Sequence, residues 1–563
     1  MSFIETLLRI DPLAKFVAIF VCVFTVLTIV YSLEHMRKRG GLVRYYIYVV
    51  VTGLVSVAAV LSNNLVLFMV FWGFLGLLLY VLINFGQTDR TSLTAKKSFI
   101  IIGGTDAFML LGLALLFQAT HYVELSRFLT LKMAALRVPL DSRSAIIAYL
   151  CLAAGALAKA GAMPFHTWVP DTAEDAPTPV TAFLPASLDK LLGVYFLVRL
   201  SRDVFVMNNE MNTLLMALGS VTIVGAVMMA LVQRDMKRML GYDSVSQVGY
   251  MMLGIGTGTD LGLAAALFHM FNYTLYKSCL FFAGGAVEQR AGTSDLDRLG
   301  GLCKAMPITF MTFLIAALAI SGVPPLNGFY SKWMLYQAVI AMGAGGGFPL
   351  WIIWLLAAMF GSALTLAVFM KLTHSVFLGQ RSEGGEGSRE VGAAMWLPSV
   401  LLAAACVVFG VAAYRLPLPH IICPSLNTGI EQLGLTGAWR PGLATGLIII
   451  GLVIGYVVYL LGTATKSRTV QPFVGGEILD EQRDMRVSGA DFYDTVEQTA
   501  GLSTMYRMAE ARLFDVYEVG RNFTLGLSKV LSFLHNGVLP RYLAWCLLGV
   551  VVLLYALIRW QTW

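Results

Sequence analysis

Long apolar segments separated by short polar loops run along most of this chain. They lie near residues 13–33, 43–62, 64–85, 97–118, 144–161, 180–200, 211–232, 240–256, 260–286, 306–322, 327–343, 350–376, 395–414, 441–463 and 541–560. Several exceed the roughly 18 residues that a helix needs to cross a bilayer. Since some neighbouring segments resemble two halves of one interrupted helix, the pattern predicts an all-α polytopic membrane protein with about 13–15 transmembrane helices.

The composition narrows the class further. Of the 563 residues, 58% are hydrophobic and 13% are charged, and the mean hydropathy is +0.74. Soluble domains carry about twice that share of charge, which excludes a soluble enzyme, a disordered chain and a nucleic-acid binder. An outer-membrane barrel is also excluded, because its segments are short and alternate in polarity. We interpret the net charge of +7 as loop charge beside anionic lipid.

No cofactor site is evident in the sequence. The seven cysteines are scattered, with no CxxC pair and no His/Cys set at metal-ligand spacing. Most of them lie in apolar runs, where cysteine behaves as a small hydrophobic residue. GxGxxG, Walker A and HExxH motifs are absent too. We therefore expect neither a metal nor a redox cofactor in this chain.

Two proline-containing segments interrupt the helical pattern. One covers residues 159–179 and includes Pro164 and Pro170, and the other covers residues 321–332 and includes Pro324 and Pro325. Proline removes a backbone donor, and in lipid such a break persists only where protein or water satisfies the freed groups. Interrupted helices at corresponding places in two halves are typical of transporters built from inverted repeats. Two ordinary loops are the alternative, and spacing alone leaves both open.

The two ends of the chain differ in character. The run at 13–33 is not followed by a small-residue cleavage site, which predicts a retained helix. The basic run 37–39 favours a cytoplasmic location for the end of that helix, although other basic loops leave the orientation open. From about residue 464 the chain is polar, and residues 491–534 predict an amphipathic helix before a final anchor. Such a helix is suited to the membrane surface or a partner subunit; a small hairpin packed on its own chain is the alternative.

Ionisable residues inside apolar runs are the strongest functional signal, because charge is costly in a bilayer. The candidates are Asp106, Lys159, Asp189, Lys190, His269, Lys277, Lys332, Lys371 and His374. His269 and Lys277 are eight residues apart, so on a helix they share a face at a separation of about 12 Å.

Buried lysines suit proton transport. Desolvation favours the neutral amine, whereas a nearby carboxylate favours the ammonium, so movement of the partner charge switches the lysine near neutral pH. A row of such groups with water between them is a proton relay. For each single lysine the alternatives are a side chain that extends to the membrane surface and a structural ion pair.

Four ordered motifs resemble the antiporter-like subunits of respiratory complex I. They are residues 159–171 followed by 176–182, residues 233–250, the helix with His269 and Lys277, and Gly328-Phe-Tyr-Ser-Lys332. The resemblance covers roughly residues 10–380. It is nearest to chain L of NADH-quinone oxidoreductase and its relatives in membrane-bound hydrogenases and cation/proton antiporters. Residues 473–477 with 491–493 look more like the hydrogenase-type relatives.

The resemblance implies some fourteen helices in two inverted five-helix repeats, each with a broken helix. It also implies proton, sometimes sodium, translocation driven by redox chemistry in other subunits. By motif, the implied roles are Lys159 in the first half-channel, Lys237 as the connecting lysine, His269 and Lys277 in the central axis, Lys332 on the exit side, and Asp106 at a family aspartate.

Three positions depart from the family pattern. Gly73 stands where the family usually has a glutamate, Pro185 replaces a broken-helix histidine, and Tyr273 stands where a second central-axis histidine often occurs. The carboxylate that modulates Lys159 is thus missing from its usual helix. Either Asp106 or Asp189 replaces it, or the first half-channel is inactive.

The expected organisation is residues 1–95 as N-terminal transmembrane helices, 96–256 as the first repeat, 257–380 as the start of the second, 381–463 as further transmembrane helices, 464–540 as the polar segment with its lateral helix, and 541–563 as the anchor.

The leading functional hypothesis is an ion-translocating subunit of a complex I-like or hydrogenase-like assembly in a prokaryotic cytoplasmic membrane. Iron–sulfur clusters, a nickel–iron site or flavin are then expected only in partner subunits, and H⁺ or Na⁺ is the transported ion. A stand-alone cation/proton antiporter is the second hypothesis. A degenerate membrane scaffold, or a subunit of another uptake complex, is the third.

Overall fold

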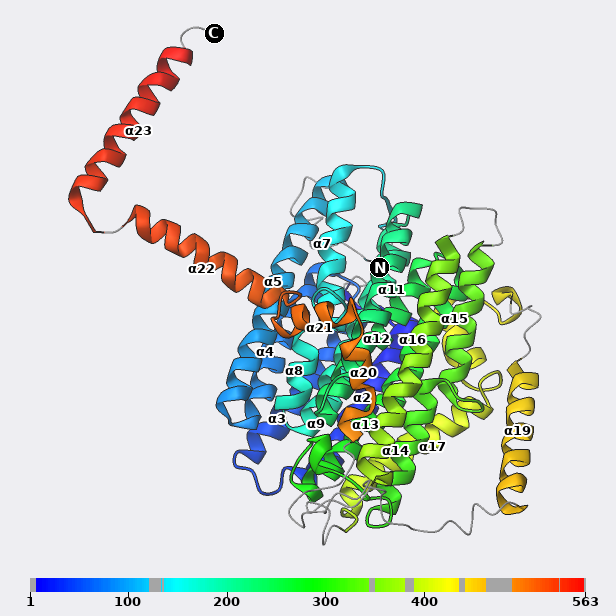
Figure 1. Ribbon diagram of the computed structural model, residues 1–563. Helices are drawn as coiled ribbons and strands as arrows, with labels where there is room; N and C mark the ends of the chain where they lie inside the picture. The colour runs from blue at the N-terminus through cyan, green and yellow to red at the C-terminus, as the bar shows by residue number, and fades with distance from the viewer. Residues whose placement is uncertain are drawn as a thin grey trace, which may run out of the picture. The chain divides into compact units, whose positions relative to one another are not determined.

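The protein is described here by a computed structural model that covers residues 7–120, 133, 136–343, 350–379, 389–434, 441–461, 489–535 and 537–560. The motif at 473–477 and the beginning of the polar segment, residues 464–488, lie outside these described residues. The chain divides into two compact units, Met1–Ser503 and Thr504–Trp563. In the first unit the long helices run side by side as a bundle (Figure 1).

The described chain is almost entirely helical, as predicted. Its α-helices are α2 (Pro12–His35), α3 (Leu42–Leu61), α4 (Leu65–Ile83), α5 (Asp89–Ala119), α7 (Arg143–Ala160), α8 (Trp168–Asp175), α9 (Thr178–Phe183), α10 (Asp189–Arg199), α11 (Asn209–Leu231), α12 (Met236–Gly256), α13 (Asp260–Ala291), α14 (Pro307–Ser321), α15 (Asn327–Gly343), α16 (Leu350–Thr373), α17 (Ala393–Val411), α18 (Cys423–Leu426), α19 (Pro441–Leu461), α20 (Asp494–Gln498), α21 (Leu502–Glu510), α22 (Val516–Leu534) and α23 (Leu539–Trp560). The strands β1 (Val138–Pro139) and β2 (Phe205–Val206) form one short parallel pair.

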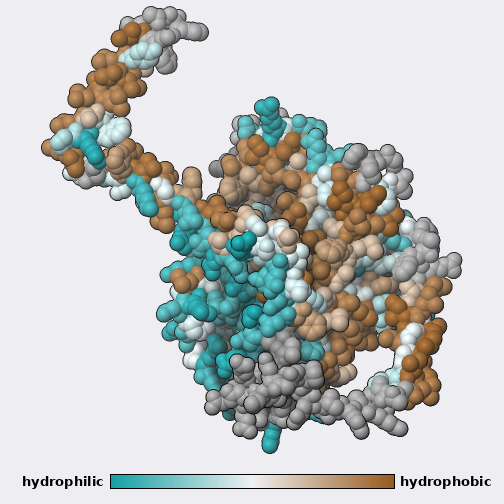
Figure 2. Space-filling model, viewed as in Figure 1, coloured by the Kyte–Doolittle hydropathy of each residue, from teal (hydrophilic) through white to brown (hydrophobic). Residues whose placement is uncertain are grey.

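Eleven of the described helices are long and apolar enough to cross a membrane. The chain is therefore an integral membrane protein. Helices α12 and α13, of 21 and 32 residues, are also long enough, but their polar and charged residues keep them outside that set. The shorter α14 and α15 are outside it as well, and these four helices account for the difference from the predicted 13–15. Apolar side chains cover much of the visible surface (Figure 2), as lipid contact requires.

Helix α13 is the centre of the bundle. Every residue from Leu261 to Val287 is buried, and α12, α14, α15 and α17 pack around this helix. Helices α11 and α12 approach each other closely at Gly219 and Gly249, where an added Cβ would lie within 3 Å of the opposite backbone. Larger residues there would push the two helices apart.

Both predicted breaks separate two helices and share one local design. Helix α7 is followed by Gly161 and α14 by Gly322, both with positive φ. In each case the N–H groups of the glycine and of the next residue donate to carbonyls of the last helical turn. This is the glycine-terminated helix end that a following proline reinforces. The equivalence fits the predicted repeats, which stay a prediction.

A π-helical segment, Leu184–Leu188, joins α9 to α10. It contains Pro185, which cannot donate to the preceding turn, so the hydrogen-bond spacing widens there. Asp189 and Lys190 follow directly. π-Helical insertions of this kind are frequent at functional sites.

The prediction of a single amphipathic helix over residues 491–534 is wrong in one respect. The region is divided into α20, α21 and α22, with interruptions around Gly501 and Arg512, both of which have positive φ. In the second unit α22 keeps its large apolar side chains exposed, among them Phe523 and Val530. Helix α23 corresponds to the predicted final anchor.

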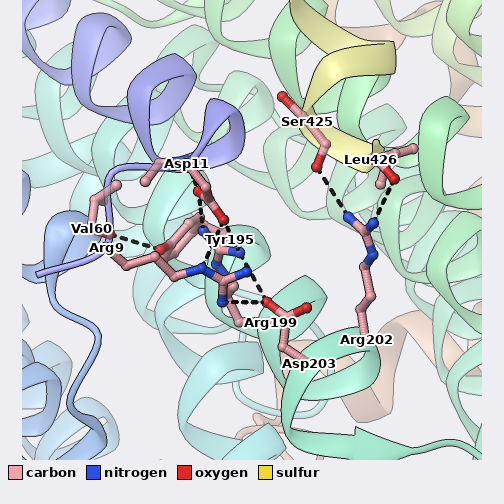
Figure 3. A network of polar contacts seen from close by, with 10 residues as sticks. Arg9, Asp11, Val60, Tyr195, Arg199, Arg202, Asp203, Ser425 and Leu426 are labelled. Atoms are coloured by element: carbon pink, nitrogen blue, oxygen red, sulfur yellow. Dashed lines mark hydrogen bonds and ion pairs between the residues drawn. The ribbon is translucent and has the colours of Figure 1, made fainter. Parts of the chain in front are cut away.

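A charged network joins the start of α2 to the end of α10 (Figure 3). The guanidinium of Arg199, 2% exposed, donates to Asp11 at 2.6 Å and to Asp203 at 2.9 Å. Arg9 also pairs with both carboxylates, at 2.9 and 2.8 Å. Burial alone would raise the pKa of Asp11, but the hydrogen bond and charge of Arg199 outweigh it, so the pKa of Asp11 lies below its ordinary value.

We expect Asp11→Asn to lower the stability of the protein by about 1–3 kcal/mol at neutral pH. Asparagine still caps α2, so the loss reports the charge. Because the folded pKa of Asp11 is lowered, its stabilisation is complete above about pH 4 and disappears as the pH falls through the folded value. Denaturation midpoints in detergent at several pH values measure this, with the exposed Asp141→Asn as control. A difference from the native protein that persists in acid would contradict the assignment.

Candidate functional site

The first group of buried charges lies between α4, α5 and α7. Trp72 on α4 stands between Asp106 and Lys159: its indole Nε1 donates to Asp106 Oδ1 at 3.0 Å. Lys159 Nζ lies 3.5 Å from the Trp72 carbonyl and 4.6 Å from the ring centroid. Lys159 is 1% exposed, and the charges of both Asp189 and Asp106 act on it. Trp72 therefore joins a carboxylate to a lysine across three helices.

The π-helical segment places Asp189 and Lys190 in the next part of the interior. They are 4% and 0% exposed, and within the described residues neither Asp189 Oδ2 nor Lys190 Nζ has a hydrogen-bond partner. Lys190 Nζ lies 5.4 Å from the Trp168 ring centroid. An added Cβ at Gly161 would lie 2.7 Å from this ammonium. The break after α7 thus makes room for a buried lysine.

Helices α12, α13 and α15 carry a hydrogen-bonded chain of side chains. Lys277 Nζ pairs with Asp243 Oδ2 at 2.6 Å, both residues being 0% exposed. Gln247 Nε2 donates to Asp243 Oδ1 at 3.2 Å, and Gln247 Oε1 lies 3.2 Å from His269 Nε2. His269 Nδ1 lies 3.1 Å from Ser331 Oγ. His269 and Lys277, which were predicted to share one helix face, are therefore connected through side chains of α12.

Lys332 follows Ser331, the last residue of this hydrogen-bonded chain. Its Nζ donates to the Ile320 carbonyl at 2.8 Å, at the end of α14, and lies 4.9 Å from the Tyr250 ring centroid. The charge of Asp243 acts on Lys332 as well as on Lys277. Lys190 and Lys277 are close enough for their charges to interact. We define the buried charge row as Asp106, Lys159, Asp189, Lys190, Lys277, Asp243 and Lys332; Asp106 is partly exposed, and the other six are buried.

Four predicted residues lie outside this row, and one of them, His269, is connected to it through Gln247. Lys237, near the start of α12, pairs with Glu288 at 2.9 Å. Lys371 donates to the carbonyls of Leu231 and Gln233 at 2.7 and 3.1 Å, at the C-terminal end of α11. His374 is exposed, and its ring lies 5.6 Å from that of Phe492. In the described structure, Lys237, Lys371 and His374 therefore contact groups that do not belong to the row.

Three further residues of the site, Asp243, Trp72 and Gln247, were not predicted from the sequence. Asp243 stands in the apolar run 240–256, so the criterion that found Asp106 applies to it equally. Trp72 and Gln247 carry no charge, and their role follows from contacts between helices. For them the sequence offers no comparable signal.

A groove between α4 and α5 opens beside Gly73. Its volume is about 570 Å³, and it is lined by Val66, Val70, Gly73, Leu77, Asp106 and Leu113 among others. An added Cβ at Gly73 would meet nothing within 4 Å. The position of the expected glutamate is therefore open space, and Asp106 is the carboxylate that lines it. Among the described residues, no group of three or more His, Cys, Asp or Glu could hold a metal ion.

Comparisons with known proteins agree with the fold and the motifs. The family described as NADH:quinone oxidoreductase/Mrp antiporter, TM matches residues 62–372. NADH-quinone oxidoreductase subunit L of Mycobacterium tuberculosis is 32% identical over 471 residues, which cover 82% of this chain and 71% of that protein. The Na(+)/H(+) antiporter subunit A1 of Staphylococcus haemolyticus is 30% identical over 422 residues, 72% of this chain and 52% of that protein.

Among solved structures, a chain of the membrane-bound sulfane sulfur reductase, an archaeal respiratory membrane complex, superimposes with a TM-score of 0.78. It is 22% identical, and the match covers 98% of this chain and 89% of that one. The two share a fold.

The chain belongs to the NADH:quinone oxidoreductase/Mrp antiporter family of membrane proteins. The resemblance drawn from four motifs is confirmed, as is the all-helical polytopic fold. The chain spans about half the length of the antiporter subunit A1 and of another curated relative.

We expect Gly73→Ala to leave stability within about 0.5 kcal/mol of the native value, because its side chain enters open space in the groove. Gly193→Ala is the matched comparison on α10, where the new Cβ would lie 2.6 Å from the Ala160 backbone nitrogen. That change should cost about 1–3 kcal/mol through overpacking. Denaturation midpoints of the two variants measure this difference. Equal losses of stability would contradict the assignment of open space beside Gly73.

Proposed function

We propose that this chain carries protons, or sodium ions in exchange for them, along the buried charge row as the antiporter-like subunit of a larger membrane assembly. The observation that carries the proposal is the continuity of the row. Carboxylates and lysines follow one another from Asp106 to Lys332 across the centre of the bundle, each within electrostatic range of the next. Buried charge is expensive, and a purely structural bundle has no need of it.

The chemistry of the row suits ion transfer. A lysine beside a carboxylate holds its proton, and it releases that proton when the carboxylate is neutralised or engaged elsewhere. Lys159, Lys190 and Lys277 each have such a carboxylate within range. His269 and Gln247 supply hydrogen-bonding groups between Asp243 and Ser331. A change in the charge of one group of the row thereby alters the electrostatic energy of the next group.

The missing family glutamate is replaced, on this proposal, by two carboxylates. Asp106 reaches Lys159 through Trp72, and Asp189 acts on Lys159 from α10. The first half-channel then stays active in spite of Gly73. This favours transport over the degenerate scaffold.

The remaining question is which kind of membrane complex contains this chain. We propose a redox-driven complex of the complex I or hydrogenase type in a prokaryotic cytoplasmic membrane, with iron–sulfur, nickel–iron or flavin centres in the partner subunits. The resemblance to the Na(+)/H(+) antiporter subunit A1 favours an antiporter without an electron donor as the second candidate. Purification of the chain with its native partners separates them: an iron–sulfur or nickel–iron protein in the complex supports the first, and transport by a complex without redox centres supports the second.

We expect Asp106→Asn combined with Asp189→Asn to reduce ion translocation roughly a hundredfold, with the assembly intact. Lys159 then has no carboxylate to hold its proton. Proton or sodium uptake into inverted membrane vesicles, driven by the native donor or an imposed gradient, is the measurement. Asp141→Asn with Asp260→Asn, two exposed carboxylates, is the matched control and should keep native rates. Full translocation in the first double variant would show that neither aspartate replaces the glutamate.

A further inference from the structure

The second half of the buried charge row has fewer carboxylates than lysines. Asp189 lies beside Lys190 and acts on Lys159 as well. On the other side, Lys277 and Lys332 come from α13 and α15, and the carboxylate whose charge acts on both is Asp243 of α12. One negative charge thus faces two ammonium groups on two helices.

The two lysines are held differently. Lys277 makes a direct ion pair with Asp243 at 2.6 Å. Lys332 donates to the Ile320 carbonyl and lies over the Tyr250 ring, contacts that carry only partial negative charge. The carboxylate whose charge acts on Lys332 is that of Asp243, which is not in direct contact with it. Tyr250, Tyr273 and Tyr276 also face Asp243, but they are neutral phenols that bring no competing charge.

A chain of polar side chains ties Asp243 to the surroundings of Lys332. Gln247 contacts Asp243 and His269, and His269 contacts Ser331, the residue before Lys332. All of these side chains are buried. A change in the position or hydrogen bonding of Asp243 is therefore transmitted through close contacts to α15.

We propose that Asp243 is a positioning residue whose single charge is shared between Lys277 and Lys332, so that the two lysines compete for it. This inference rests on the proposed function for its meaning in transport, but it is tested independently of transport. When Lys277 is neutral, the charge of Asp243 is no longer balanced locally and stabilises the ammonium of Lys332 more strongly. The carboxylate thereby links the charge on α13 to the charge on α15.

A cycle of stability measurements tests the sharing. The denaturation midpoint of the complex in mild detergent is measured for Asp243→Asn, Lys332→Met and the double variant. Sharing predicts that Lys332→Met is more favourable by about 2–4 °C in the Asp243→Asn background, because Lys332 has lost its counter-charge there. Lys371→Met is the matched control, since that buried lysine donates to backbone carbonyls, and its effect should add to that of Asp243→Asn.

The same cycle in the Lys277→Met background tests competition directly. There Asp243 faces only Lys332, so the interaction between them should grow. This background also keeps the test usable if Asp243→Asn alone fails to assemble, because no charged Lys277 is left unpaired. Midpoint changes that add for Asp243 and Lys332 in both backgrounds would overturn the proposal, as would an interaction that is the same with and without Lys277.

Translocation supplies the second readout. Asp243→Asn should reduce ion uptake roughly tenfold or more, and Asp243→Glu should restore part of it, because a carboxylate is again within reach of both lysines. Additive midpoints, together with uptake that depends on Asp106 and Asp189, would overturn the sharing alone. An interaction in the cycle, together with uptake that no variant of the row changes, would support the sharing and overturn the proposed function.

Discussion

A charge removed from water costs several kcal/mol unless an opposite charge or hydrogen bonds accompany it, and the interior of this protein is arranged around that cost. Most of the buried lysines have a compensating group close by. Lys277 has Asp243, Lys237 has Glu288, and Lys371 has two backbone carbonyls. Lys159 lies against the face of Trp72, whose indole in turn holds Asp106. The charges therefore come as connected groups.

Helix geometry makes those connections possible. Glycines let α11 and α12 approach to backbone contact, and the central α13 is surrounded on all sides by other helices. The π-helical segment at Pro185 and the helix end at Gly161 bring Lys190 to a place where its ammonium has room. Breaks in regular structure are thus located where charge has to be accommodated, which in a membrane interior is where freed backbone groups find partners.

The substitution at Gly73 shows how one lost carboxylate changes its surroundings. The groove beside it is apolar apart from Asp106 and the indole of Trp72. Carboxylates of other helices, Asp189 and Asp243, stand next to lysines deeper in the bundle. The negative charge of the row is therefore distributed over α5, α10 and α12, while α4 contributes an aromatic side chain.

The sequence by itself determined the helical segments, the membrane class and the family, because apolar runs and short motifs are local patterns. It also located most members of the row, since an ionisable residue in an apolar run is visible without a structure. The division of the predicted helix over residues 491–534 and the contacts made by Trp72 and Gln247 depended on the three-dimensional structure. So did the separation of Lys371 and His374 from the row, and the pairing of Asp243 with Lys277. Pairing is a property of distance between helices, and hydrophobic periodicity specifies which face of a helix is buried but not which charges meet there.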